Sequence, residues 1–580
     1  MRSVEVMPSG RYKLVTEEKA GGVTYTPGCL AAFVAEQIYR ASRIKPGHDT
    51  IKVLDPATGD GELLINLLAQ LDMANVGAVE VHGFETNIRA LNITTARIKQ
   101  HFPKVMLHLT HGSFLEFVLD QMCRCGSGDL FKKDAAQAYD LIIANPPYVR
   151  TQIMGAKQAQ LIASQFGLTG RVDLYHAFIV GMAHVLKPGG LGGIIVSNRF
   201  MTTKSGRTVR QAIRERFSVR HVWDLGDTKL FDAAVLPAVL LVEKQAGPQQ
   251  TVANFTSIYT TTNTPTQQAT DVIAALDRDG VVAVDDGRCF MVRNGHLDIR
   301  TPTDTVWRVK TMVSDDWLTM VEGHTWRRFG DIGKIRVGVK TCADKVFIRS
   351  DWDTMPESTR PELLRPLTTH HVARRFRARE GEKIRHILYP HESLNGHRRV
   401  SDLSLYPKAR AYLETHRDIL EARTYVIEGG RRWYEIWVPH DPSSWDAPKL
   451  VFRDISEMPI FWLDLEGNVI NGDCYWLRCE RPEDIELLWL AAAVANSTFI
   501  ESFYDHSFNN KLYAGRRRYI TQYVERFPLP DPTLPGSRVI IGMAKQIYDA
   551  IGSSEADAIA VELDKLVWKA FGVLAKEVAR

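Results

Sequence analysis

The tetrapeptide Asn145-Pro146-Pro147-Tyr148 places an amide, two rigid prolines and an aromatic ring directly after the apolar residues 139–144. Proline lacks an N–H and has a fixed φ, so the pair ends the predicted strand and stiffens the backbone after it. Open α/β sheets bind ligands beyond the carboxyl ends of their strands. There, the Asn145 side-chain oxygen and the Pro146 carbonyl could accept the two protons of an amino group while Tyr148 stacks on its plane. Methylation of an exocyclic amine requires such a site; the alternative is a strand-ending turn with a core tyrosine.

A glycine-containing loop precedes the tetrapeptide in the chain. Residues 51–61 (Ile-Lys-Val-Leu-Asp-Pro-Ala-Thr-Gly-Asp-Gly) pass from a predicted strand into this loop, and residues 62–71 have the pattern of a helix. Its glycines allow a tight turn and close approach of a ligand, but the spacing is neither that of a dinucleotide fingerprint nor that of a phosphate loop. The next predicted strand, residues 80–84, ends in Glu85, where such folds hold ribose hydroxyls. These features together indicate S-adenosylmethionine as the donor; a helix-capping Asp55 and a solvated Glu85 are the alternatives.

Size and composition narrow the class of protein. The 580 residues predict two or more domains, and 45% hydrophobic with 24% charged residues is ordinary for a soluble globular protein. No apolar run approaches the roughly 20 residues that span a bilayer, and the N-terminus has no apolar signal core, so we expect a cytoplasmic protein without membrane contact. The seven cysteines are scattered and provide no tetrahedral zinc site, so no metal is predicted.

Positive charge is concentrated between Arg365 and Glu435, where fifteen Lys/Arg face nine Asp/Glu. Aromatic residues interleave with these arginines, as on surfaces that bind phosphates and stack on bases. A solvated charged face is the alternative. The segment therefore favours a polyanionic partner, and the residues expected to contact it are Arg374, Arg375, Arg377, Arg398, Arg399, Arg431 and Arg432.

The pattern of elements changes along the chain. Residues 25–244 alternate short apolar strands with helical periods, which predicts a doubly wound parallel sheet, and the polar residues 149–170 are expected to form a loop over the site. Residues 246–265 are rich in Gln, Thr and Pro and are predicted to be a linker. Eleven of the twelve tryptophans follow residue 300, which indicates a second unit of different composition. The expected domains are thus residues 1–245 and 266–580.

With these motifs in this order, the chain resembles the gamma-class N6-adenine DNA methyltransferases of bacterial restriction–modification systems. The resemblance rests on residues 24–27, 55–61, Glu85 and 145–148, and on weaker phrases such as Asn496-Ser497 in the second half. It implies a Rossmann-like methyltransferase domain followed by a mixed α+β target-recognition domain. The cofactor would be S-adenosylmethionine, and the substrate an adenine flipped out of double-stranded DNA. A cognate restriction endonuclease acting independently is the further partner expected.

The resemblance also implies individual roles. Glu85 would bind the cofactor's ribose, and Phe231 would cover the second face of the base, with an ordinary core phenylalanine as the alternative. The family usually has an acidic residue where this chain has Ser113; Ser113 would then accept only weakly from the cofactor's adenine, or Asp140 would serve instead. The remaining cofactor-binding residues implied are Thr26, Pro27, Asp55, Ala57, Gly59 and Gly61, and the catalytic set is Asn145, Pro146, Pro147 and Tyr148.

Three other functions stay open at this point. Glutamine-amide protein methyltransferases use the same tetrapeptide, but they are short and have no counterpart to the basic, aromatic second half. Methylation of N4 of cytosine or of an RNA amine fits the tetrapeptide equally, because it recognises an amine on a ring. A non-enzymatic DNA-binding subunit is disfavoured by the intact tetrapeptide.

Overall fold

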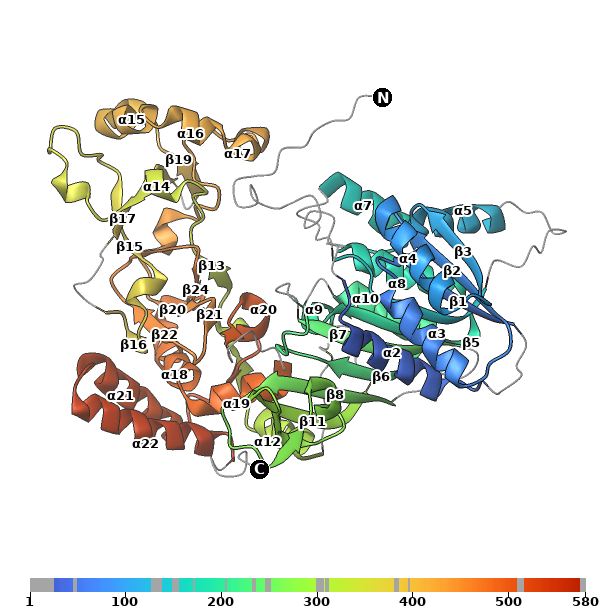
Figure 1. The fold of residues 1–580 in the computed structure, drawn as a ribbon. Coiled ribbons are helices and arrows are strands. Elements are labelled where there is room, and N and C mark those ends of the chain that lie inside the picture. Colours follow the sequence, from blue (N-terminus) through green and yellow to red (C-terminus); the bar gives the residue numbers. More distant parts are fainter. Residues whose placement is uncertain are drawn as a thin grey trace. The chain divides into compact units, whose positions relative to one another are not determined.

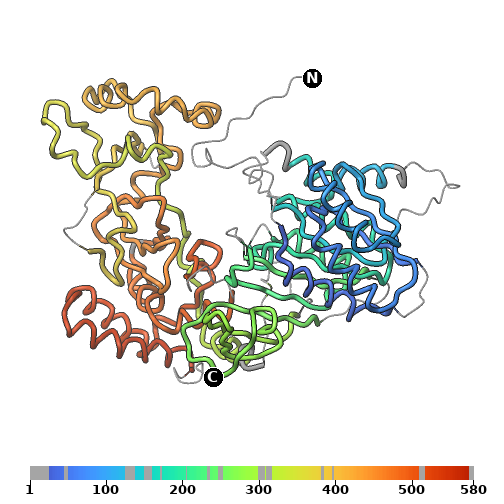
Figure 2. Tube along the Cα trace, in the orientation of Figure 1, coloured from blue at the N-terminus to red at the C-terminus, as the bar shows by residue number. Residues whose placement is uncertain are grey.

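The computed structural model divides the chain into two compact units, Met1–Thr311 and Met312–Arg580 (Figures 1 and 2). The structure describes residues 25–44, 50–126, 138–148, 156–169, 173–203, 206–231, 236–245, 252–298, 307, 312–379, 385–394, 397–508 and 516–573. Among these residues, no helix has both the length and the apolar character required to cross a membrane.

The first unit is built on an eleven-stranded sheet with strand order β3-β2-β1-β4-β5-β7-β6-β8-β11-β10-β9. Its first five strands in this order are parallel, and β7 runs antiparallel between β5 and β6. The strands of this part are β1 (Ile51–Asp55), β2 (Val79–Glu85), β3 (Met106–His111), β4 (Tyr139–Ala144), β5 (Leu186–Ser197), β6 (Phe217–Asp224) and β7 (Pro237–Lys244).

Helices cover both faces of this sheet, as the alternation of strands and helices in the sequence predicts. Successive strand residues point to opposite faces, so Val53 packs with the helices of one layer and Leu54 with those of the other. Because both faces are covered at the centre of the sheet, the central strand β4 is apolar apart from Asp140, whereas the edge strand β3 is mostly exposed. The first layer contains α2 (Gly28–Ala41), α3 (Glu62–Met73) and α4 (Ile88–His101), and the second contains α5 (Phe114–Gly126), α7 (Ala156–Gln165), α8 (Leu174–Val185) and α10 (Arg207–Arg216).

The predicted linker at residues 246–265 is wrong for the part that the structure describes. Residues 252–260 form β8 (Val252–Thr260), which pairs with β6 and with β11 (Cys289–Asp298) inside the sheet. Strands β9 (Gln267–Ala269) and β10 (Gly280–Val284) extend the sheet further, and the first unit ends at residue 311 instead of 245. Threonine favours strands because it is β-branched, so a Thr-rich run is a poor indicator of a linker. Residues 246–251 lie outside the described residues.

One further sequence expectation needs correction. Residues 156–165 of the predicted loop form helix α7, and residues 149–155 lie outside the described part.

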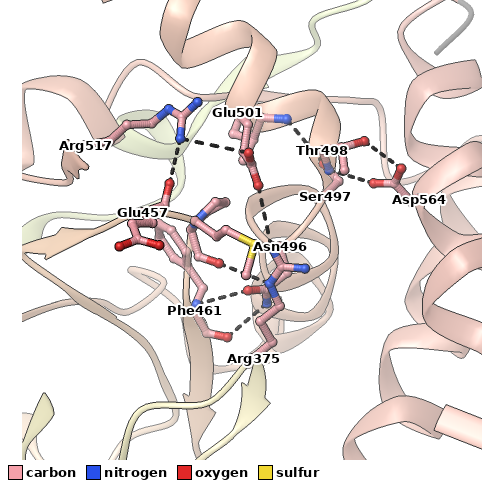
Figure 3. Close-up of polar contacts among 12 residues, drawn as sticks. Arg375, Glu457, Phe461, Asn496, Ser497, Thr498, Glu501, Arg517 and Asp564 are labelled. Carbon is pink, nitrogen blue, oxygen red and sulfur yellow. Dashed lines mark hydrogen bonds and ion pairs between the residues drawn. The ribbon is translucent and has the colours of Figure 1, made fainter. Parts of the chain in front are cut away.

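Two consecutive helices of the second unit, α18 (Ile485–Ala495) and α19 (Thr498–Phe508), are separated by a short break. The break occurs at Asn496, whose Oδ1 accepts from Phe461 N at 3.0 Å while its Nδ2 donates to Phe461 O at 2.9 Å (Figure 3). Asparagine side chains of this kind compete with the helical hydrogen bonds of the backbone.

The second unit is a mixed α+β unit, as expected. A five-stranded sheet has the order β13-β24-β20-β22-β16, and a four-stranded sheet has the order β14-β17-β15-β23. Trp352, Trp445, Trp462 and Trp476 are fully buried in this unit, which accounts for the tryptophan-rich composition. Its elements include β13 (Ile335–Val337), β14 (Ile348–Arg349), β15 (Leu364–Thr368), β16 (Phe376–Arg377), β17 (Arg385–Leu388), β18 (His391–Leu394), β19 (His397–Val400), β20 (Lys449–Arg453), β22 (Phe461–Asp464), β23 (Val469–Ile470), β24 (Cys474–Leu477), α21 (Pro535–Asp549) and α22 (Ser554–Ala570).

Candidate functional site

A cavity of about 550 Å³ lies beyond the carboxyl ends of β1, β2 and β4. Its wall includes the glycine loop, Glu85 and the tetrapeptide 145–148, so the structure brings together the two motifs that the sequence predicted to cooperate. The volume is in the range of sites that bind small molecules and cofactors.

The glycine loop has a conformation that its glycines alone permit without strain. Gly59 and Gly61 have φ values of 52° and 86°, in the left-handed region. A Cβ atom at Gly61 would also lie 2.8 Å from Cγ2 of Thr94. Gly61 is the N-cap of α3, and Glu62 and Leu63 at the start of this helix line the cavity.

Glu85 holds the glycine loop in place from the end of β2. Its Oε2 accepts a hydrogen bond of 2.9 Å from Gly59 N, and its Oε1 accepts one of 2.7 Å from Asn87 N. Each carboxylate oxygen has a further lone pair. Glu85 lines the cavity and therefore has acceptor capacity for the hydroxyls of a ligand.

Asp55 lies behind the wall of the cavity instead of lining it. Its side chain is fully buried, its Oδ1 accepts from Ala57 N at 3.0 Å, and burial raises its pKa to about 7. Asp55 thus braces the loop that forms the wall. Thr58 lines the cavity, and its buried Oγ1 has no hydrogen-bond partner among the described residues. A buried polar atom in such a position fits a polar ligand in the cavity.

Thr26 lies directly before α2, where Pro27 is the N-cap and no side chain caps the helix. Thr26 Oγ1 instead accepts a hydrogen bond of 3.0 Å from Asn145 Nδ2, and both residues line the cavity. This contact holds the Asn145 amide with Nδ2 toward Thr26, and Oδ1 is its accepting atom.

The hydroxyl end of Tyr148 is buried, whereas its ring faces the cavity. The hydroxyl is buried without a hydrogen-bond partner in the described part of the chain, and burial raises its pKa well above the ordinary value. Its ring is only partly buried, lines the cavity and packs edge-on against Tyr175 with centroids 6.3 Å apart. The arrangement provides a fixed, uncharged aromatic face.

Ser113 lines the cavity beside Gly112, as expected, but Asp140 does not. Asp140 Oδ1 forms an ion pair of 2.7 Å with Lys187 Nζ, and its Oδ2 accepts from Lys52 N, so Asp140 does not replace the missing acid. The cavity has another carboxylate, Glu116, in the first turn of α5. Glu116 follows Ser113 by three residues, which is about one helical turn, so the two side chains are neighbours and the sequence spacing alone could have identified Glu116 as a candidate replacement acid.

Phe231 is not brought to the cavity. Its side chain is 6% exposed and belongs to the hydrophobic cluster that contains Trp223, Leu225 and Val239. The structure thus places this ring in the core, which was the alternative explanation. Pro27 is likewise absent from the described wall of the cavity.

Comparison with known proteins assigns the chain to a family. The model of the Eco57I restriction-modification methylases matches residues 70–231, and that of the TaqI-like C-terminal specificity domains matches residues 401–529. The type II methyltransferase M.BanIII of Aneurinibacillus aneurinilyticus is 37% identical over 97% of this chain and 98% of that protein. The chain belongs to the type II restriction–modification methyltransferases.

Two further similarities agree with this assignment. The type II methyltransferase M.BstVI of Geobacillus stearothermophilus is 23% identical over 83% of this chain and 86% of that protein. The structure of the type IIL restriction-modification enzyme MmeI in complex with DNA has a TM-score of 0.56 at 15% identity, over 96% of this chain and 73% of that one. Because only 15% of the residues are identical, the similarity to MmeI shows a shared fold and nothing more. By its membership of this family, the chain is an S-adenosylmethionine-dependent DNA methyltransferase.

Most of the arginines predicted to contact DNA make contacts within the second unit of the methyltransferase. Arg375 Nε donates to Pro459 O at 3.2 Å, and its guanidinium lies 3.6 Å from Glu501 (Figure 3). Arg517 approaches the same carboxylate, and burial raises the pKa of Glu501. The internal contacts of the others are Arg374 to Arg377 O and Ala378 O, Arg377 to the Tyr548 ring, Arg431 to Ile436 O, and Arg432 to the Tyr434 hydroxyl. Of this set, Arg398 and Arg399 on β19 and Arg432 are exposed.

A different pair of arginines is available to a partner. Arg336 on β13 lies 5.5 Å from the ring of Trp476, the residue opposite it on β24, and Arg478 follows that strand. Burial and the nearby charge of Arg478 lower the pKa of Arg336. Neither guanidinium has an ion-pair partner among the described residues. Two adjacent unneutralised cations cannot be recognised from a sequence in which they are 142 positions apart.

Proposed function

We propose that the methyltransferase transfers a methyl group to N6 of adenine at a specific sequence in double-stranded DNA. The observation that carries this proposal is the oriented Asn145 amide beside Pro146 and Tyr148 in the wall of the cofactor cavity. Two acceptors and an aromatic face are what a flipped base with an exocyclic amine requires.

The side chains have a direct role in activating the amine, whose lone pair is delocalised into the ring. Asn145 Oδ1 and the Pro146 carbonyl accept hydrogen bonds from the two N–H groups of the amine. These bonds favour a pyramidal nitrogen and stabilise the positive charge that develops on it. Tyr148 stacks on the base and fixes its plane, and this contact offsets part of the cost of unpairing. When bound, S-adenosylmethionine supplies an electrophilic methyl group on a sulfonium sulfur.

The cofactor site would use groups that the cavity already presents. Glu85 would accept from the ribose hydroxyls, and Thr58 would contact the cofactor through its buried hydroxyl. Glu116 would accept from the amino group of the cofactor's adenine, in place of the acid missing at Ser113. Gly59 and Gly61 allow the loop to approach the ligand closely.

The second unit would bind the DNA through its free cations. Arg336 and Arg478 would contact phosphates, because two adjacent positive charges favour a polyanion. Arg398 and Arg399 on the exposed strand β19 would make further contacts to the backbone or the major groove. A cognate endonuclease that acts independently stays a prediction from family membership.

The test is to incubate the protein with labelled S-adenosylmethionine and unmethylated genomic DNA and then to separate the nucleosides. We expect label in N6-methyladenine, with none from the Asn145→Ala variant. Label in N4-methylcytosine, in RNA or in protein would contradict the adenine assignment and identify the amine that is methylated instead.

A further inference from the structure

Three side chains that can bind a metal converge at the edge of the first unit's sheet. His82 on β2 and His108 on β3 are direct partners in the parallel register, and Glu80 precedes His82 by two residues on the same face. β3 is the edge strand of the sheet. The two imidazoles are stacked with centroids 4.9 Å apart, and the edge of Tyr139 packs against His82.

The two imidazoles approach the same oxygen of the carboxylate. Nε2 of His82 lies 2.7 Å and Nε2 of His108 lies 3.9 Å from Glu80 Oε1, and the three donor atoms are all within 4.8 Å of one another. Lys52 Nζ lies 3.2 Å from the other oxygen, Oε2, so it neutralises part of the carboxylate while Oε1 is the oxygen that the two imidazoles approach. In a tetrahedral site with bonds of about 2.0–2.1 Å, ligand atoms are about 3.3 Å apart. The distance from Glu80 Oε1 to His82 Nε2, 2.7 Å, is shorter than this value, and the distance to His108 Nε2, 3.9 Å, is longer.

We propose that Glu80, His82 and His108 bind one divalent transition-metal ion, for which zinc is the best fit. Two imidazole nitrogens and one carboxylate oxygen are ligands that Zn²⁺ accepts, and water would complete the tetrahedron. The His108 side chain is 56% exposed, so an ion can enter from solvent, whereas the His82 side chain is 10% exposed and rigidly held.

The ion would join the two strands that support one side of the cofactor cavity. β2 ends in Glu85, β3 leads to Gly112 and Ser113, and Gly112 N donates to Glu85 O at 3.0 Å. A metal near the opposite ends of these strands would fix their pairing at an otherwise unprotected sheet edge. Its effect is thus expected on stability, and the methyl-transfer chemistry does not depend on it.

The test uses the full-length protein without DNA or cofactor, after treatment with a chelator. Titration with Zn²⁺ against a chromophoric competitor should give a site of about one ion per chain, and Zn²⁺ should raise the melting temperature. His108→Gln should lower the affinity by about 10-fold or more and remove most of the thermal shift, since even changes outside the ligand set cost this much. His101→Gln, at the exposed end of α4, is the matched control and should bind as the wild type does.

A second variant and a second metal ion distinguish binding at Glu80, His82 and His108 from binding by cysteine thiolates. Glu80→Gln removes the oxygen ligand and should weaken binding as His108→Gln does. Co²⁺ at this site should give the visible bands of tetrahedral coordination without a thiolate charge-transfer band. The proposal is overturned if the wild type binds no stoichiometric ion, if both variants bind like the wild type, or if the Co²⁺ spectrum shows thiolate ligands.

Discussion

The side-chain amide of Asn145 donates a hydrogen bond of 3.0 Å to the hydroxyl of Thr26, a residue 119 positions earlier in the chain. The bond joins the segment before α2 to the tetrapeptide after β4, and both residues line the cavity at the carboxyl ends of β1, β2 and β4. In the structure Nδ2 of Asn145 faces the Thr26 hydroxyl, and Oδ1 is the atom of the amide that can accept from an amine. The proposed amine acceptor is therefore oriented by a residue outside the tetrapeptide.

Thr26→Val tests this orientation because it keeps the shape of the side chain and removes the accepting hydroxyl. The loss of one hydrogen bond is worth about 1 kcal/mol, so kcat is expected to fall about 5-fold. Asn145→Ala removes the acceptor itself and is expected to lower kcat by about 100-fold or more, since loss of one preorganised polar group has effects of this size. Steady-state methylation rates and cofactor affinities should be measured for both variants.

The two variants differ in what would contradict the assignment. Cofactor affinity should be retained in Asn145→Ala, and a large loss there would place Asn145 in the cofactor site. A Thr26→Val variant with unchanged kcat would show that the Asn145 amide needs no orienting partner.

Gly61→Ala tests whether the glycine loop depends on its backbone. The substitution combines a left-handed φ of 86° with a Cβ atom 2.8 Å from Thr94 Cγ2. Strain of this kind costs about 1–2 kcal/mol or more in unfolding free energy, and displacement of the loop should also weaken cofactor binding. Chemical denaturation and cofactor titration are the measurements.

Gly189→Ala is the matched control, because Gly189 has a φ of 79° but no atom within 4 Å of the added Cβ. It should show the backbone strain alone and leave cofactor affinity unchanged. If Gly61→Ala behaves like Gly189→Ala, the close contact with Thr94 is unimportant and the loop tolerates a side chain.

The sequence predicted those features of the first unit that depend on local patterns. Alternation of apolar strands and helices predicted the sheet, and the glycine loop, Glu85 and tetrapeptide 145–148 were correctly expected at one cavity. All three follow the carboxyl ends of neighbouring parallel strands, a relationship that topology fixes once the strand order is known.

Features that depend on contacts distant in sequence were not predicted. β8 is held by pairing with β6 and β11, and its sequence, Val-Ala-Asn-Phe-Thr-Ser-Ile-Tyr-Thr, has no regular alternation of polar and apolar residues. Phe231 was assigned to the active site by its position in a motif, but the core offers its ring a more favourable environment. The arginines near residue 375 were expected at a DNA surface because their charge is visible in the sequence, whereas their internal acceptors, such as Pro459 O, are not.

Asp224→Asn tests a buried polar network at the end of β6. Asp224 accepts from Asn198 Nδ2 at 2.9 Å and from the Tyr259 hydroxyl at 2.7 Å, and burial raises its pKa from 3.8 to about 6. Because the folded-state pKa is above the unfolded-state value, the contribution of this group to stability is complete below about pH 4. It is lost as the pH rises through about 6. The difference is about 3 kcal/mol in unfolding free energy between pH 4 and pH 8.

The Asn variant cannot ionise and should lack this part of the pH dependence in urea denaturation. Tyr259→Phe is the companion variant, because the lost hydrogen bond favours the charged form of Asp224. Its decline in stability should begin at the same pH, near the unfolded-state pKa, and should continue to a higher pH than in the wild type. An Asp224→Asn variant whose stability profile is parallel to that of the wild type would show that Asp224 does not titrate in this range.

The last prediction concerns the pair Arg336 and Arg478 in the second unit. Gln substitutions keep much of each side chain but remove the charge, so the packing of Arg336 on Trp476 is largely preserved. If each arginine contacts one phosphate, the double variant should lower the salt dependence of DNA binding, d log K/d log[salt], by about two. The loss of affinity should be similar for specific and unrelated duplexes, because phosphate contacts carry no sequence information. Arg417→Gln is the matched control, since Arg417 is paired with Glu414 and Glu421. Equal salt slopes for the double variant and the wild type would place the DNA on another face of this unit.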